Sequence, residues 1–416
     1  MILKESRWET SINKYYPKLT ESIETDVVIV GAGITGIFNA YLLSRAGLSV
    51  VVLEKNEKIL QSATLYTTAL ITKIIDSSLS ELVSIFGSNK ARLVWQSGQE
   101  AINLIADIVN KEHIDCEFGF VSAYTYASNG EQFKKLAKEY ETIKKLGFEA
   151  NLQKDGSKLN VKNSGYLEIP NQAKFHPVKF ANVLANLAEA AGVKFFTDSE
   201  VMVASNQVAT TKAAQVKAKD IIIATYSPLT DEGTRFKKAM YVSYVYELEM
   251  AKNVIPEALY LDMQNPYHYF RIDSYEHFDR MIVGGEDHRK DIKVNPEKCF
   301  GGLQEYIKTV LEGTTYNILR EWRGNILESV DGLPFIGAIS PHIFVATAFS
   351  GNGMTYAPIS GTMICNLILR KNNYYVGLYD PKRRPTIKQL GRKGFDYAGE
   401  FFGGAVKNFF SSKKNV

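Results

Sequence analysis

The stretch that decides the fold runs from Asp26 to Lys55 and reads DVVIVGAGITGIFNAYLLSRAGLSVVVLEK. Residues 26–30 are a β-branched run typical of a strand buried on both faces, and residues 31–36 match the pattern G-x-G-x-x-G. An apolar helix pattern follows and stops at Gly47, and residues 48–53 form a second buried strand. The stretch therefore predicts one βαβ unit that binds a dinucleotide.

Each glycine of the pattern has a physical role. Gly31 makes the tight turn, Gly33 lets a pyrophosphate approach the backbone, and Gly36 lets the helix pack closely on the strand. Glu54 follows the second strand, where a carboxylate can accept hydrogen bonds from both hydroxyls of an adenosine ribose. An acid at this position disfavours a 2′-phosphate, so FAD and NAD fit this unit better than NADP.

Composition sets the broad class of protein. With 416 residues, 45% hydrophobic and 23% charged, the chain is an ordinary globular sequence long enough for two cores. It has no apolar run of about 20 residues, and its N-terminus lacks the apolar part of a secretory signal. Three widely spaced cysteines and six histidines show no metal-ligand spacing, so we expect a cytoplasmic protein without a metal site.

The net charge of +4 is concentrated in the tail. Residues 381–416 hold nine Lys and Arg against two acids, which leaves the rest of the chain mildly acidic. No basic groove or motif predicts nucleic-acid binding. Phenylalanines alternate with these basic residues, so the tail is a basic amphipathic segment that could touch the inner face of a membrane, or could equally pack on the body.

Further patterns indicate a second sheet. Residues 241–250, 258–262, 267–273 and 280–285 are strand candidates with no helix between them, so they should be antiparallel. Residues 220–225, DIIIAT, read as a buried strand that returns to the first domain. The sequence thus predicts two kinds of sheet in one chain.

Five segments in this order resemble a known family. They are GAGITG with Glu54, GYLEIPNQAKFHPVKF, DIIIAT, WRGNILESVDGLPFIG and IFVATAFSGNGMTYAP. Over residues 24–380 the chain resembles the D-amino-acid-oxidase-like (DAO) FAD-dependent oxidoreductases. It is most similar to a bacterial subgroup, some of whose members carry a C-terminal Rieske domain. No His follows His342 and no Cys follows Cys365, so we expect no [2Fe–2S] centre in this sequence.

The resemblance implies the fold class α/β plus α+β, with a Rossmann-like FAD-binding domain interleaved with an antiparallel-sheet substrate domain. The expected division is an N-terminal arm (1–25), an FAD-binding domain (26–110, 172–228 and 326–380), a substrate domain (111–171 and 229–325) and the basic tail (381–416).

The resemblance also implies the cofactor, FAD, and the residues that hold it. Ala32, Gly33, Glu54 and Lys55 would hold the adenosine and pyrophosphate, and Val201 would offer its backbone to the adenine. The full expected set is Gly31, Ala32, Gly33, Gly36, Glu54, Lys55, Ala63, Thr64, Thr68, Ala69, Leu70, Val201, Ala224, Thr225, Phe349, Gly351, Asn352, Gly353, Met354 and Thr355. The last six would wrap the pyrimidine end of the flavin, at the N-terminus of a helix.

The chain departs from the family at the substrate side. Two positions where amino-acid oxidases of this type carry a carboxylate-binding Arg are Ile326 and Gly351 here. A guanidinium is the natural receptor of a carboxylate, so its absence weakens the case for a simple α-amino-acid oxidase. No Cys lies near Trp322 to hold flavin covalently, so we expect non-covalent FAD.

Alternation on residues 267–273 suggests substrate contacts. It puts Tyr269 and Arg271 on one face of the strand and His268 on the other. The hypothesis is that Arg271, or failing that His268, supplies the polar interaction that Ile326 cannot make, with Tyr269 beside it; a surface Arg and a core His are the plainer alternatives.

The expected function is oxidation of a C–N bond of a small amine or amino acid, by hydride transfer to flavin N5, with O₂ or another electron acceptor. One alternative is an FAD-dependent 2-hydroxyacid or polyol dehydrogenase. The other is an electron-transfer flavoprotein that works with a separate Rieske-type partner.

Overall fold

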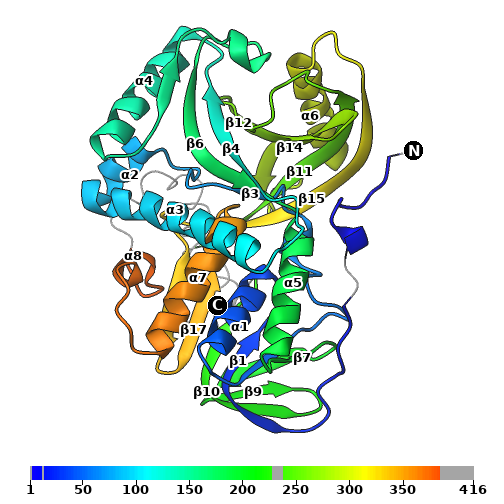
Figure 1. Cartoon of the computed structure of the whole chain (residues 1–416), viewed down its shortest axis with the longest axis vertical. Coiled ribbons are helices and arrows are strands. Elements are labelled where there is room, and N and C mark those ends of the chain that lie inside the picture. The colour runs from blue at the N-terminus through cyan, green and yellow to red at the C-terminus, as the bar shows by residue number, and fades with distance from the viewer. Residues whose placement is uncertain (1, 12–13, 227–237, 385–416) are drawn as a thin grey trace, which may run out of the picture.

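The computed structural model describes residues 2–11, 14–226 and 238–384. Two sheets lie one above the other, and α3 (Ser88–Lys111) crosses between them in the view of Figure 1. The lower sheet carries helices α1, α5 and α7, and the upper sheet carries α6 (Pro296–Val310). Nearly all of the basic tail lies outside the described residues, so its amphipathic character stays a prediction.

The lower sheet is built on parallel strands. Its path is β16-β17-β10-β1-β2-β7, and the pairs from β17 to β7 are all parallel. The bounds are β1 (Ile23–Val30), β2 (Val50–Leu53), β7 (Lys194–Phe196), β10 (Gln215–Ile223), β16 (Phe335–Ser340) and β17 (Ile343–Thr347), with β8 (Val201–Ser205) and β9 (Val208–Thr211) at one edge. The predicted βαβ unit is therefore confirmed.

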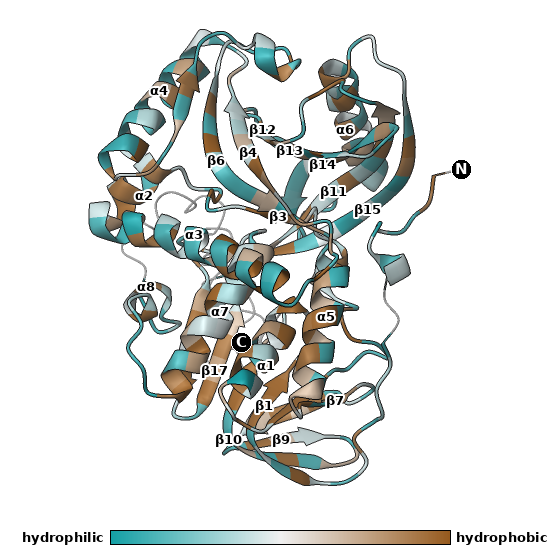
Figure 2. Ribbon diagram, in the orientation of Figure 1, coloured by the Kyte–Doolittle hydropathy of each residue, from teal (hydrophilic) through white to brown (hydrophobic). Residues whose placement is uncertain are grey.

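Three helices cover one face of this sheet: α1 (Ile34–Arg45), α5 (Pro177–Ala190) and α7 (Gly353–Ile368). They are apolar where they meet the strands, as the brown ribbons of Figure 2 show. Within this core, α1 and α7 approach closely because Gly361 has no side chain: a Cβ there would lie 3.0 Å from Leu42. Burial of this apolar surface is the main source of stability for the unit.

The upper sheet is mostly antiparallel and follows the path β15-β11-β14-β13-β12-β4-β6-β3. Its strands are β3 (Leu70–Ile71), β4 (Gly119–Tyr126), β6 (Tyr166–Lys174), β11 (Lys238–Ala251), β12 (Leu259–Leu261), β13 (His268–Ser274), β14 (Phe278–Arg289) and β15 (Tyr316–Ser329), with β5 (Asn151–Gln153) beside β6. The predicted fold class and the four predicted antiparallel strands are confirmed, although β12 pairs with β4 in parallel.

Two details differ from the expectation. Strand β6 was not predicted, because Pro170 and Asn171, whose φ is +58°, interrupt its alternation. Both β3 and β6 belong to the upper sheet, so the proposed domain boundary at 171/172 falls inside a strand and does not coincide with the division between the sheets. The remaining helices are α2 (Leu79–Phe86), α4 (Gly130–Lys145) and α8 (Val376–Tyr379).

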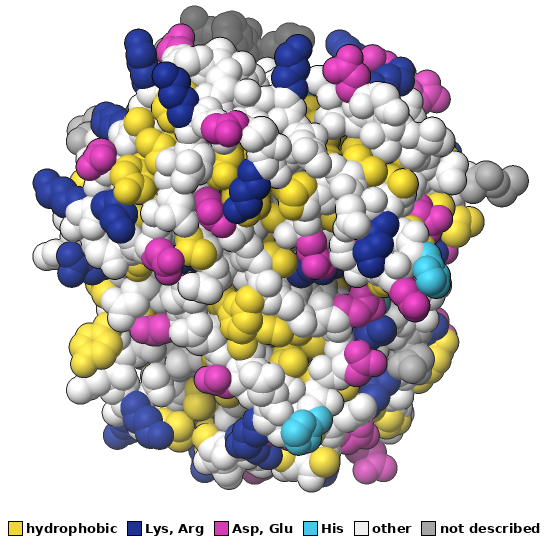
Figure 3. Space-filling model, turned by 45° about the horizontal axis from the view of Figure 1, so that its top comes forward, with side chains coloured by type: hydrophobic (Ala, Val, Ile, Leu, Met, Phe, Trp, Pro, Cys, Tyr) yellow, Lys and Arg dark blue, Asp and Glu magenta, His cyan; other side chains and the backbone are white. Residues whose placement is uncertain are grey.

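The surface gives two further observations. On the face shown in Figure 3, Lys and Arg side chains are interspersed with Asp and Glu, so that face offers no continuous basic track. None of the helices within residues 2–384 that the structure describes has both the length and the apolar character to cross a bilayer.

Candidate active site

The predicted cofactor loops meet at one edge of the lower sheet. Strands β1, β2, β10 and β17 are parallel neighbours, so the loops that follow them lie at the same carboxyl edge. The backbone N–H of Ala224 donates to Val30 O at 2.9 Å, which ties the end of β10 to the end of β1. In open sheets of this kind, ligands bind beyond this edge.

The glycine-rich turn has the geometry that a dinucleotide needs. Gly31 has φ +104°, and a Cβ there would lie 2.9 Å from Ala224 O and 3.4 Å from Thr225 N. A Cβ on Gly36 would lie only 1.9 Å from Gly31 O, so α1 can begin this close to the turn only with glycine. Gly33 is the N-cap of α1 and adds no side-chain cap, which leaves first-turn N–H groups for an anion.

Glu54 lies beside this turn at the end of β2. It is 5% exposed, and its carboxylate accepts from Ala32 N at 2.8 Å and from Asn56 N at 3.0 Å. The backbone N–H of Ser199 donates to Glu54 O at 2.8 Å, which brings the start of β8 at Val201 alongside. The predicted adenosine residues are therefore neighbours, while Lys55 is exposed.

The hydroxyl-rich segment from Ala63 to Thr72 links the two sheets. Thr64 Oγ1 accepts from Ile34 N at 3.1 Å, at the start of α1. Thr68 is buried, and Ala69 has φ +59°, an uncommon conformation that costs energy in a residue with a Cβ. The segment then continues into β3 at Leu70, so it runs from the glycine-rich turn to the upper sheet.

The last predicted loop is joined to this segment. The hydroxyl of Thr355 donates to Thr72 O at 3.0 Å and accepts from Thr72 N at 3.2 Å. Ser350 and Gly351 have φ +48° and +78°, and such backbone conformations cluster at ligand sites. Helix α7 begins at Gly353 with Asn352 as its N-cap, so its partly positive end faces this region. Phe349 is half-buried and Met354 is buried here.

One face of the upper sheet lies over the segment from Ala63 to Thr72. Trp322 Nε1 donates to Tyr66 O at 3.2 Å, and Arg271 Nη1 donates to Ala69 O at 2.9 Å. Tyr269 shares this face. Its ring lies flat over Gly284 of the neighbouring strand β14, since a Cβ on Gly284 would be 2.6 Å from the Tyr269 hydroxyl. The hydroxyls of Tyr269 and Ser243 are 3.3 Å apart. This face, with Tyr269 at its centre, is the candidate substrate side.

Arg271 does not have the role that was hypothesised. It is 1% exposed, and Nε and Nη2 donate to Asp273 Oδ2 at 3.3 and 2.8 Å, while Nη1 donates to two backbone carbonyls, those of Ala69 and Phe175. Its donors are thus used within the protein. We correct the hypothesis: Arg271 joins the segment from Ala63 to Thr72 to the upper sheet and is not placed to bind a substrate.

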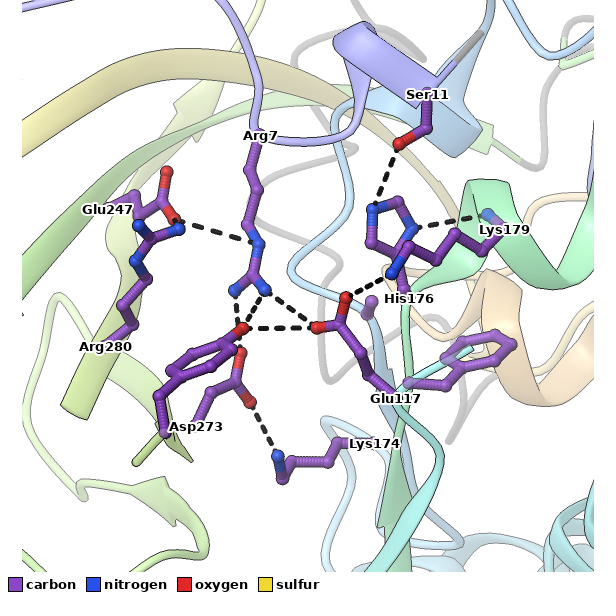
Figure 4. Close-up of polar contacts among 12 residues, drawn as sticks. Arg7, Ser11, Glu117, Lys174, His176, Lys179, Glu247, Asp273 and Arg280 are labelled. Atoms are coloured by element: carbon purple, nitrogen blue, oxygen red, sulfur yellow. Dashed lines mark hydrogen bonds and ion pairs between the residues drawn. The ribbon is translucent and has the colours of Figure 1, made fainter. Parts of the chain in front are cut away.

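The N-terminal arm completes this buried network, and Figure 4 shows Arg7 between Glu117, Glu247 and Asp273. Arg7 Nη1 donates to Asp273 at 2.9 Å and Nη2 donates to Glu117 at 2.8 Å. Trp8 is fully buried, and its Nε1 donates to Thr67 O at 2.7 Å. The sequence predicted an N-terminal arm but gave no signal that Arg7 and Trp8 would reach the segment from Ala63 to Thr72.

His268, the second candidate, faces the other way. Its ring stacks on Tyr306 of α6 with centroids 4.0 Å apart, and Nδ1 lies 3.0 Å from Asp262 Oδ2. Nε2 lies 3.2 Å from Glu286. Although burial opposes its charge, these two carboxylates raise the pKa of His268. It is a core histidine on the α6 side, so its proposed substrate contact is corrected as well.

A carboxylate that sequence reasoning missed stands on the candidate face. Tyr267 donates to Asp287 Oδ2 at 3.2 Å, while Oδ1 is buried without any hydrogen-bond partner. Burial raises the pKa of Asp287 to about 6, against the opposing effect of the neighbouring Ser243 and Tyr267 hydroxyls. The pattern IVGGED gave no signal for this, because a register shift between Val242 and Tyr244 breaks the alternation there.

Asp287 therefore predicts a pH-dependent gain in stability for Asp287→Asn. Since its pKa is about 6 when folded and near 3.8 when unfolded, the ionised group costs folding free energy that is absent below pH 4 and complete above pH 6. We expect the variant to be more stable by up to about 3 kcal/mol at pH 8 and nearly unchanged at pH 4, in urea unfolding. The control is Glu276→Gln, which changes a side chain that is 87% exposed. Its stability should equal that of the wild type at both pH 8 and pH 4. Equal stability of Asp287→Asn and wild type at pH 8 would contradict this account.

Comparison with known proteins agrees with this geometry. The family model described as DAO: FAD dependent oxidoreductase matches residues 26–367. The chain is 32% identical over 422 residues to Bacillus subtilis YhfW, whose name describes a Rieske 2Fe-2S iron-sulfur protein, covering 97% of this chain and 81% of YhfW. It is 24% identical to the γ-glutamylputrescine oxidoreductase of Escherichia coli, over 87% of this chain and 88% of that protein.

Solved structures share the fold. The crystal structure of glycine oxidase from Geobacillus kaustophilus matches with a TM-score of 0.74 at 19% identity, over 87% of this chain and 99% of that one. L-proline dehydrogenase from P. horikoshii matches with a TM-score of 0.73 at 20% identity, over 88% and 98%. The glycine-rich turn, the acid after β2 and the family match over residues 26–367 lead to one conclusion: the chain belongs to the DAO family of FAD-dependent oxidoreductases.

Proposed function

We propose that the protein oxidises a C–N bond of a small amine or amino acid, with FAD held non-covalently between the two sheets. The observation that carries this proposal is the meeting of three parts: the turn after β1, the loop before α7, and a sheet face with Tyr267, Tyr269 and Ser243. FAD supplies the hydride acceptor, its N5 atom, when it is bound.

The protein's own residues have positioning roles in this proposal. Ala32, Gly33 and Glu54 are suited to the adenosine and pyrophosphate, and the N-terminus of α7 is suited to the pyrimidine end. The tyrosines of the sheet face can orient the donor carbon and exclude water. No dedicated base is required, because an amine that is neutral, or that first passes a proton to water, can lose hydride directly from the adjacent carbon, and the resulting iminium then hydrolyses in water.

The second candidate is an electron-transfer flavoprotein with a separate Rieske-type partner. The observation that favours it is the similarity to YhfW, whose name describes an iron–sulfur protein. A 2-hydroxyacid or polyol dehydrogenase on the same fold is the third candidate, and the absence of Arg at Ile326 and Gly351 argues against a carboxylate-bearing substrate for it.

One experiment separates the three candidates. The yellow holoprotein is mixed without oxygen with amines, amino acids, 2-hydroxyacids and polyols, and bleaching of the flavin near 450 nm is followed. We expect amines or amino acids to bleach it and hydroxy compounds to leave it yellow. Readmitting oxygen then shows whether O₂ is the acceptor. Acid precipitation should release the flavin into the supernatant, and a yellow pellet would contradict non-covalent binding. Bleaching by no donor at all would favour the electron-transfer candidate.

A further inference from the structure

The carboxylate of Asp287 lacks the partner that a buried charge needs. Oδ1 is buried with no hydrogen-bond partner, and Oδ2 has the Tyr267 hydroxyl at 3.2 Å. Within residues 2–11, 14–226 and 238–384, no Lys or Arg forms an ion pair with Asp287. Buried charges in proteins are normally paired, so the carboxylate of Asp287 is the group that a cationic partner from outside the chain would complete.

A β-bulge aims Asp287 at the candidate face. Val242 pairs with His288 and Tyr244 pairs with Gly285, so Ser243 alone stands opposite two residues of β14. Without the bulge, strict alternation from Gly284 would put Asp287 on the α6 side. With it, Glu286 points to α6 and contacts His268, while Asp287 contacts Tyr267. Bulges commonly re-aim a side chain beside an active site.

One cation on the same face already has an acidic partner: Arg289 pairs with Tyr241 and so shares this face, and its Nε and Nη2 donate to Asp291 at 3.0 and 2.7 Å. Tyr241 also pairs with Ile326, and Val245 pairs with Trp322, whose indole donates to Tyr66 O in the segment from Ala63 to Thr72. Alternation along β15 therefore turns Ile326 and Glu328 to this face as well. The charge of Glu328 helps to raise the pKa of Asp287, so the two carboxylates lie close enough to interact.

These contacts select a kind of ligand. An ammonium group can donate to Asp287 Oδ1 and lie against the rings of Tyr267 and Tyr269, which attract cations through their faces. A substrate α-carboxylate would instead meet the like charge of Asp287, while the guanidinium of Arg289 is already bound by Asp291.

We propose that this site binds its substrate as a cation at Asp287, and that the substrate is an amine without an α-carboxylate. The inference rests on the proposed function, because it takes the face with Tyr269 as the substrate side. It narrows the substrate class from amines and amino acids to amines alone.

The first test uses two ligands that cannot react, because neither has a C–H bond next to nitrogen. tert-Butylammonium and pivalate have the same tert-butyl body and opposite charges. Each is titrated into the holoprotein at pH 8, and the shift of the flavin absorption gives Kd. We expect the cation to bind at least tenfold more tightly than pivalate. Equal binding, tighter binding of pivalate or binding of neither would overturn the inference without any variant being made.

The variant Asp287→Asn then locates the cation. We expect it to bind tert-butylammonium at least tenfold more weakly while keeping its FAD content, and Glu276→Gln, whose side chain is 87% exposed, to bind like the wild type. Asn has the size of Asp, so the tyrosine contacts keep their geometry. Unchanged cation affinity in Asp287→Asn would overturn the assignment to this residue.

The second test uses reactive pairs that differ by one carboxylate: 1,4-diaminobutane with ornithine, and 1,5-diaminopentane with lysine. We expect the diamines to bleach the flavin without oxygen at least tenfold faster at equal concentration. If the amino acids bleach it equally fast, the proposed function stands and this inference fails. If the cation binds in the first test and no amine or amino acid bleaches the flavin, the cation site stands and the proposed function fails.

Discussion

Replacing Gly36 with alanine is expected to weaken FAD binding by roughly 100-fold, about 2.7 kcal/mol. The added Cβ would lie 1.9 Å from the carbonyl oxygen of Gly31, well inside van der Waals contact, so the turn and the start of α1 have to move apart. The N-terminus of α1 and the backbone of Ala32 and Gly33 would then no longer converge on one phosphate. Titration of apoprotein with FAD, followed by flavin fluorescence, gives the two dissociation constants.

The matched control is Gly301→Ala in α6, where a Cβ would meet nothing within 4 Å. This exchange adds to the helix a methyl group that contacts nothing. We therefore expect unchanged FAD affinity and a stability equal to that of the wild type or higher by up to about 1 kcal/mol. A Gly36→Ala variant with the FAD affinity of the wild type would show that the turn between β1 and α1 does not hold the cofactor.

The βαβ unit could be predicted from sequence because its determinants are local. One buried strand ends before Gly31, a second ends before Glu54, and glycines stand at fixed spacing between them. This pattern is typical of a strand, a tight turn, a helix and a second strand, which the structure has. The antiparallel strands were predictable for the same reason, since alternation and turn residues lie within each strand. Local patterns therefore indicated the fold class and the loops that meet at the carboxyl edge.

The polar side chains of the substrate face could not be predicted in this way. Alternation correctly grouped Arg271 with Tyr269, but it did not show what Arg271 contacts. Arg271 donates to Asp273 of the same strand and to the carbonyl of Phe175, and Asp273 in turn accepts from Arg7. Asp287 reaches the face through a bulge, which shifts alternation by one residue. Sequence patterns specify periodicity, whereas these contacts depend on tertiary pairing between segments that lie far apart in the chain.

The network around Asp273 predicts the largest loss of stability. Its carboxylate accepts from Arg271 at 2.8 Å, from Lys174 at 2.8 Å and from Arg7 at 2.9 Å, at the junction of the arm, the segment from Ala63 to Thr72 and the upper sheet. Although burial alone would raise the pKa of Asp273, the three cations hold it well below 3.8. Asp273→Ala removes the carboxylate that these three buried cations share. We expect this variant to lose about 3–5 kcal/mol of the free energy of unfolding, measured with urea at pH 7.5.

The pH dependence of this loss identifies its cause. A carboxylate whose pKa is lowered in the folded state stabilises the protein above its unfolded pKa, and this contribution disappears as the pH falls below about 4. Wild type should therefore lose stability toward acid more steeply than Asp273→Asn, and the difference between them should narrow between pH 5 and pH 3. Asp291→Asn, which removes a 60% exposed carboxylate, should cost no more than about 1 kcal/mol. A constant difference between Asp273→Asn and wild type across this pH range would mean that shape, rather than charge, makes Asp273 important.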